Sequence, residues 1–166
     1  MKRLLPLAEQ AAVLLKTRGE NVAVAESSTA GLICAALVAV PGASAYFIGG
    51  GVIYTAVAQR GLLDIPRETL RGVRASTEAY ARLGAQTIRT RLGTHWGIAE
   101  TGATGPTGNP YGDAAGHSCI AVIGPIERSI TLETGRADRV ENMWAFAEAA
   151  LRLFVDCLRA ADQMTR

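Results

Sequence analysis

The chain has 166 residues, 49% of them hydrophobic and 19% charged, which predicts one domain with a substantial apolar core and argues against intrinsic disorder. Its net charge of +2 is too small to indicate nucleic-acid binding by electrostatics alone. The three cysteines lie far apart and neither histidine has a cysteine at ligand spacing, so we expect a reducing compartment, no disulfide framework and no metal site.

The first half of the chain alternates helical and strand patterns. Apolar residues recur at helical spacing from Leu4 to Leu15, and Gly19 is placed to end that helix. Pro66 suits the first position of a later helix. In chain order we predict a helix over 4–18, a strand over 21–25, a helix over 29–40, a glycine-interrupted strand over 46–54, and helical segments over 55–63 and 64–70.

The second half ends in a hairpin and a long amphipathic helix. Asp138, followed by Glu141 three residues later, resembles a capping box at the start of that helix. We predict a helix over 77–92, a strand over 95–101, a glycine-rich loop over 102–116, and two hairpin strands over 117–123 and 128–134. The fold class that follows is α/β: a three-layer α/β/α sandwich with a mixed, mostly parallel sheet, formed by residues 1–166 as a single domain.

The amino terminus is a poor secretory signal, because Pro6 interrupts its short apolar run and Glu9 and Gln10 follow. No stretch approaches the ~20 apolar residues that a membrane span needs. We therefore expect a cytoplasmic protein without a membrane partner.

Two polar loops follow predicted strands, "ESSTAG" at 26–31 and "TGATGPTG" at 101–108. Ligands of such folds bind outside the carboxyl ends of the strands, and helix amino termini attract anions. The second loop is not a P-loop, since it lacks the Gly-Lys-Ser/Thr ending. The pattern predicts a crevice for a small anionic ligand, such as a nucleotide or another phosphate-bearing molecule.

The segment "AESSTAGLICAALVAVPGASAYFIGGGVIYTAVAQRGLLDIP" resembles the signature of the CinA carboxy-terminal domain family, which runs near "AESCTGG…PGSSAYF…YSNEAK…LLGV". A second family element, near "TGIAGPTGG", is matched by 101–108. The resemblance implies an α/β/α fold without metal or cofactor and a tendency to form homo-oligomers. Family members include nicotinamide mononucleotide deamidases, which hydrolyse the amide of nicotinamide mononucleotide to the acid and ammonia.

The resemblance assigns roles residue by residue. Ser27 matches the serine proposed as nucleophile, and Gln59 occupies the position of the family lysine that would assist it. Ser28 stands where the family usually has cysteine. The residues expected at the substrate are Glu26, Ser28, Thr29, Gly31, Ser44, Tyr54, Thr101, Gly102, Thr104, Gly105 and Gly108.

The missing lysine changes the expected mechanism. A serine hydroxyl needs a base to become a good nucleophile, and glutamine cannot serve as one. On sequence position, His117 and Glu100 are the remaining candidates for the base. Ala137 and Glu141 also stand where the family favours arginines suited to phosphate.

Three hypotheses follow. The chain is a nicotinamide mononucleotide amidohydrolase that uses Ser27, a catalytically impaired paralogue that binds a nucleotide or small anion, or an enzyme of altered substrate that uses His117 or Glu100 as base. Each candidate catalytic residue also has a purely structural interpretation: Ser27 as a helix cap, His117 as a hydrogen-bonded structural histidine, and Glu100 as the partner of an arginine.

Overall fold

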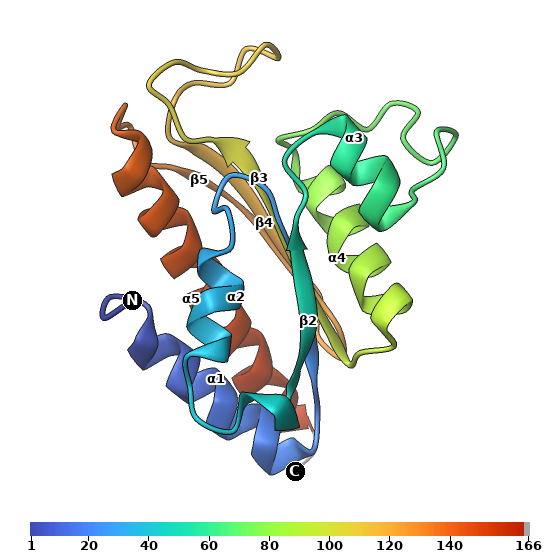
Figure 1. The fold of residues 1–166 in the computed structure, drawn as a ribbon, viewed down its shortest axis with the longest axis vertical. Coiled ribbons are helices and arrows are strands. Elements are labelled where there is room, and N and C mark those ends of the chain that lie inside the picture. Colours follow the sequence, from blue (N-terminus) through green and yellow to red (C-terminus); the bar gives the residue numbers. More distant parts are fainter. Residues whose placement is uncertain (165–166) are drawn as a thin grey trace.

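A computed structural model describes residues 1–164 as a five-stranded sheet between two helical layers (Figure 1). The elements in chain order are α1 (Leu5–Arg18), β1 (Val22–Glu26), α2 (Leu32–Val38), η1 (Ala43–Ala45), β2 (Phe47–Val52), α3 (Ala56–Ala58), η2 (Gln59–Leu63), α4 (Glu78–Leu92), β3 (Trp96–Ala103), β4 (His117–Ile123), β5 (Arg128–Glu133) and α5 (Arg139–Met164).

The sheet has the order β2-β1-β3-β4-β5. Strand β1 pairs in parallel with both β2 and β3, whereas β3 with β4 and β4 with β5 are antiparallel. The predicted α/β class and mixed sheet are confirmed, but "mostly parallel" is too strong. The terminal hairpin joins the sheet beside β3, so antiparallel pairs equal parallel ones.

Helices α1, α2 and α5 cover one face of the sheet and α4 covers the other (Figure 1). The first face is packed with large side chains, including an edge-to-face contact between Trp96 and Phe154 with ring centroids 5.7 Å apart. The second face carries small residues on the strands, among them Ala23, Ala99 and Ala121, so α4 lies close to the sheet.

Local capping chemistry explains the helix ends that the sequence predicts correctly. The Thr77 hydroxyl accepts a hydrogen bond from the Tyr80 N–H (3.2 Å) at the start of α4. Gly19 adopts a left-handed φ of 63° at the end of α1, where its N–H reaches the last carbonyls of the helix.

Three predicted helical segments differ from the structure. The helix expected over 29–40 is shorter, because Ala30 and Gly31 take positive φ values of 52° and 94° and α2 begins at Leu32. The segment 64–70 forms consecutive turns rather than a helix: N–H groups there bond three residues back, and Gly72 follows at a φ of 75°. The segment 55–63 divides into the short α3 and the π-helical η2.

Within residues 1–164, no helix is both long and apolar enough to cross a membrane.

Gly97 tests the close approach of α4 to β3. A Cβ at this position would overlap the Ala85 carbonyl oxygen and lie 2.8 Å from the Arg89 Cβ. Because both neighbours belong to a packed helix, Gly97→Ala should lower the free energy of unfolding by about 1–3 kcal/mol in a urea titration. Gly61→Ala is the matched control, since nothing lies within 4 Å of its added Cβ, and it should change stability by less than about 0.5 kcal/mol. Equal urea midpoints for the two variants would contradict this packing.

Candidate functional site

A pocket of about 280 Å³ opens where the carboxyl ends of β1, β2 and β3 meet. Ser27 follows β1, Tyr54 follows β2, Thr101 belongs to β3, and Gln59 comes from η2. The full lining is Ser27, Ile53, Tyr54, Thr55, Ala56, Gln59, Leu70, Val73, Arg74, Ala75, Tyr80, Thr101 and Tyr111. Four residues that the sequence predicts for the site thus share one pocket.

Ser27 is half-buried between this pocket and a smaller cavity of about 20 Å³. The smaller cavity is also lined by Glu100 and by Tyr80 and Gly84 of α4. The backbone N–H of Ser27 donates to Glu100 Oε2 (3.2 Å), which fixes the turn that carries the serine.

Glu26, expected at the substrate, is fully buried and caps α2 instead. Its carboxylate accepts hydrogen bonds from the backbone N–H groups of Gly31 (2.9 Å), Ile33 (3.0 Å) and Cys34 (2.7 Å). These are N–H groups that a helix start leaves without internal partners, so the carboxylate serves α2 and not a ligand.

Glu100 organises the other side of the same turn. Its Oε2 accepts from the Thr29 N–H (2.9 Å) and the Thr29 hydroxyl (3.0 Å), and its Oε1 contacts the Ser28 hydroxyl and the Ser118 hydroxyl (3.2 Å). Burial raises the pKa of the Glu100 carboxyl, and the hydrogen bonds from Ser28, Thr29 and Ser27 offset that rise in part. Ser28 and Thr29, both predicted to bind substrate, are therefore buried and engaged with Glu100.

The second loop is held by its own polar contacts. The Thr101 hydroxyl accepts from the Ser76 N–H (3.2 Å), and the Thr104 carbonyl accepts from Asn142 Nδ2 (2.8 Å). Arg139 donates to the Gly105 carbonyl (2.7 Å) and to the Tyr54 hydroxyl (2.8 Å), so it ties the second loop to the rim of the pocket.

Glycines 102 and 108 serve close backbone packing. A Cβ on Gly102 would overlap the His117 carbonyl, and one on Gly108 would overlap the Asp113 carbonyl. Neither lines the pocket, in contrast to Thr101.

Ser44 lies at the other end of the sheet. It belongs to η1, which precedes β2, while the pocket lies beyond the carboxyl end of this strand. The structure therefore separates Ser44 from Ser27, although the family motif includes both.

His117 is not placed to act as a base. Its Nε2 donates to the Ser76 carbonyl (2.9 Å) and its Nδ1 contacts the Glu133 carboxylate. Burial lowers the pKa of the His117 imidazole, but the hydrogen bonds to Glu133 and Ser76 and the charge of Asp113 outweigh it, so the pKa is raised. Both ring nitrogens are therefore bonded to Glu133 and Ser76, and neither is directed at Ser27 by any of these contacts.

Gln59 is 3% exposed, and its Nε2 is buried without a hydrogen-bond partner among the described residues. It lines the same pocket as Ser27. An amide can donate or accept hydrogen bonds but cannot take a proton at neutral pH, so the position of the family lysine carries no base.

Arg74 and Tyr111 also line the pocket and were not predicted from the sequence. Arg74 forms a two-pronged ion pair with Asp113 (2.5 and 2.9 Å), and its guanidinium lies 5.7 Å from the centre of the Tyr111 ring. The hydrogen bond from Arg74 is the main reason that the pKa of Asp113 falls to about 2. No periodicity or motif marks these residues, because they come from irregular segments far apart in the chain.

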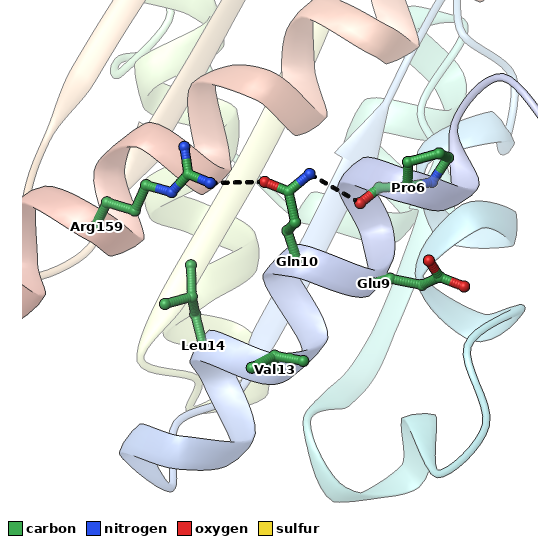
Figure 2. Close-up of a pocket in the computed structure, with 6 residues that line it drawn as sticks. All are labelled: Pro6, Glu9, Gln10, Val13, Leu14 and Arg159. Carbon is green, nitrogen blue, oxygen red and sulfur yellow. Dashed lines mark hydrogen bonds between the residues drawn. The ribbon is translucent and has the colours of Figure 1, made fainter.

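A larger groove of about 540 Å³ lies between α1 and α5 (Figure 2). Gln10 crosses it, donating to the Pro6 carbonyl (3.1 Å) and accepting from Arg159 (2.7 Å). The groove has Val13 and Leu14 on its wall and no nucleophile, so the Ser27 pocket is the better candidate site. Across residues 1–164, no three His, Cys, Asp or Glu side chains gather to hold a metal ion.

Comparisons with known proteins agree on one family. The family model "CinA C-terminal domain" matches residues 4–158. A CinA-like protein of Chlorobium phaeobacteroides is 36% identical over 159 residues, which is 93% of this chain and 38% of that protein. A CinA-like protein of Parasynechococcus marenigrum is 41% identical over 72% of this chain and 28% of its own length. The chain thus spans less than two fifths of these curated relatives.

Solved structures match over nearly their whole length. A CinA superfamily protein from Klebsiella pneumoniae superposes with a TM-score of 0.87 at 26% identity, covering 95% of this chain and 98% of that one. The competence/damage inducible protein of Agrobacterium tumefaciens gives a TM-score of 0.86 at 28% identity, covering 93% of this chain and 95% of that one.

Glu100 gives a pH-dependent prediction. Its folded pKa lies above the unfolded value of about 4.3, so the stability it contributes is fully present below that value and is lost as pH rises through the folded pKa. Glu100→Gln keeps an acceptor and a donor but cannot ionise. Wild type should therefore lose stability relative to Glu100→Gln as pH rises from 4 to 8, in urea titrations at each pH.

Glu100→Ala is the companion variant, because it leaves the buried N–H groups of Ser27 and Thr29 without an acceptor. It should lower the free energy of unfolding by about 2–4 kcal/mol at pH 4, and the difference from wild type should narrow as pH rises, because wild type itself loses stability there. A stability difference between wild type and Glu100→Gln that does not change with pH would overturn the raised pKa.

Proposed function

The chain belongs to the CinA C-terminal domain family, and from this premise we propose that its pocket binds nicotinamide mononucleotide and that Ser27 is the nucleophile of a slow amide hydrolysis. The products are nicotinate mononucleotide and ammonia. The observation that carries the proposal is the shared pocket of Ser27, Tyr54, Gln59 and Thr101, which the family motifs alone could not bring together.

The pocket walls suit a pyridine nucleotide. Tyr54, Tyr80 and Tyr111 line it and offer aromatic surface to a planar cationic ring. Arg74 also lines the pocket; Asp113 balances its charge, and the guanidinium N–H groups not used by Asp113 are donors for a phosphate. The pocket is 280 Å³ in volume, close to the lower end of the usual range for small-molecule sites.

The reaction needs two steps. The Ser27 hydroxyl adds to the carboxamide carbon and its proton passes to the nitrogen, so that ammonia leaves the tetrahedral adduct and an acyl ester of Ser27 remains. Water then hydrolyses this ester, which releases the acid and restores the serine hydroxyl. A general base would speed the proton transfers by roughly 10²–10⁴-fold. Gln59 cannot take a proton at neutral pH, the ring nitrogens of His117 are bonded to Glu133 and Ser76, and both Glu100 oxygens already accept hydrogen bonds from the turn and from Ser118, so the proposed turnover is slow.

A second function is favoured by the unpartnered amide of Gln59: the pocket binds the nucleotide without turning it over. The two functions share the ligand and differ in ammonia release, so one variant separates them.

Gln59→Lys restores the residue type that could act as base. We expect ammonia release from nicotinamide mononucleotide to rise at least ~10²-fold over wild type. Adding Ser27→Ala to Gln59→Lys should abolish that gain, because the nucleophile is then absent. Coupled ammonia detection and calorimetric titration measure turnover and binding.

Ser44→Ala is the matched serine control, since Ser44 lies at the opposite end of the sheet, and it should change neither quantity. Binding by wild type with no ammonia from Gln59→Lys would favour the binding function. No binding by either protein would remove the nucleotide from the proposal.

A further inference from the structure

Gln59 holds a buried polar atom with nothing to bond. The side chain is 3% exposed, and Nε2 has no partner in the part of the chain that the structure describes. Buried polar groups are nearly always paired, so an orphan in a pocket wall points to a partner that arrives with a ligand. Ser27 lines the same pocket, so this partner would share the pocket with the proposed nucleophile.

The backbone fixes where this amide lies. The Gln59 N–H donates to the Thr55 carbonyl (2.9 Å), and the Asp64 N–H donates to the Gln59 carbonyl (3.1 Å) across the π turn of η2. Leu63, 3% exposed at the other end of η2, anchors the turn in the core beneath α4. Gln59 therefore projects from an anchored turn, and π turns recur at functional sites.

The unpaired N–H₂ group of Gln59 determines which chemical groups of a ligand can bind to it. An amide N–H₂ needs an oxygen with lone pairs, and a carboxylate offers two such oxygens with a negative charge. A carboxamide offers one oxygen and a second N–H₂ group. Hydrogen bonds to a charged group are about twice as strong as neutral ones. Arg74 also lines the pocket, but its ion pair with Asp113 balances its charge, so the preference for an anion rests on the Gln59 donor.

We infer that Gln59 is a specificity-determining residue that makes this pocket prefer the carboxylate form of its ligand over the carboxamide form. For the identity of the ligand the inference rests on the proposed function, where the two forms are nicotinate mononucleotide and nicotinamide mononucleotide. This chain would then hold the acid product of the family reaction more tightly than the amide substrate.

Calorimetric titration of wild type, Gln59→Glu and Gln59→Met with both nucleotides tests the preference. Wild type should bind the acid about tenfold more tightly than the amide. Gln59→Glu replaces the donor by a like charge and should weaken acid binding at least tenfold. Gln59→Met removes the donor at similar size and should bring the two affinities together. Gln86→Glu makes the same charge change on the exposed face of α4 and should leave both affinities as in wild type.

A second measurement separates this inference from the proposed function. The ¹⁵N side-chain amide resonance of Gln59, assigned by its absence in Gln59→Glu, is followed during titration with nicotinate and with nicotinamide alone. It should shift at lower concentration with nicotinate.

Equal affinities of wild type for the two nucleotides would overturn the preference and leave the proposed function standing. A nicotinate-selective shift without binding of either nucleotide would support the preference and overturn the nucleotide. An amide resonance that moves with neither compound would overturn the role of Gln59.

Discussion

The buried carboxyl of Glu100 is the contact on which the candidate site depends. It reaches from the middle of the sheet to the turn after β1, where it accepts from the Ser27 and Thr29 N–H groups. Glu26 holds the other side of the turn by capping α2. Between these two carboxyls the polar groups of Ser28 and Thr29 are used internally, and Ser27 is the residue of the turn that lines the pocket. Most polar side chains of this turn therefore stabilise the turn itself and do not line the pocket.

Two arginine side chains near the pocket are also held in place by hydrogen bonds to other residues of the chain. Arg74 is paired with Asp113, and Arg139 joins the Gly105 carbonyl to the Tyr54 hydroxyl. Guanidinium groups held by such contacts lose little further side-chain entropy when a ligand arrives. Arg74 is therefore held in place with its charge balanced by Asp113, and the helix amino terminus that was predicted to attract an anion is already occupied by Glu26.

Local sequence patterns predicted the features that short-range interactions determine, such as the ends of helices. The end of α1 at Gly19 and the cap of α4 at Thr77 follow from backbone conformation and one hydrogen bond each, so they could be predicted. The role of Glu100 could not be predicted, because its partners in the turn after β1 lie 71–73 residues away and the motif gives no register between β1 and β3. The place of Ser44 could not be predicted either. The family motif includes it together with Ser27, but Ser44 precedes β2 and therefore lies at the opposite end of the sheet from the pocket.

At Gln59 the family resemblance predicts the position of the side chain but not its chemical role. The family motif predicts its position, and the structure describes it in the wall of the Ser27 pocket, so the location follows from the sequence. Its role does not, because a lysine there could be neutral and accept a proton, whereas an amide exchanges that capacity for a permanent hydrogen-bond donor. The pocket shape, its aromatic side chains and Arg74 do not depend on this exchange, so the proposed binding would be retained while proton transfer at this position is lost. With glutamine in place of the family lysine, we expect this pocket to bind the acid product more tightly than the amide substrate and to form that product slowly.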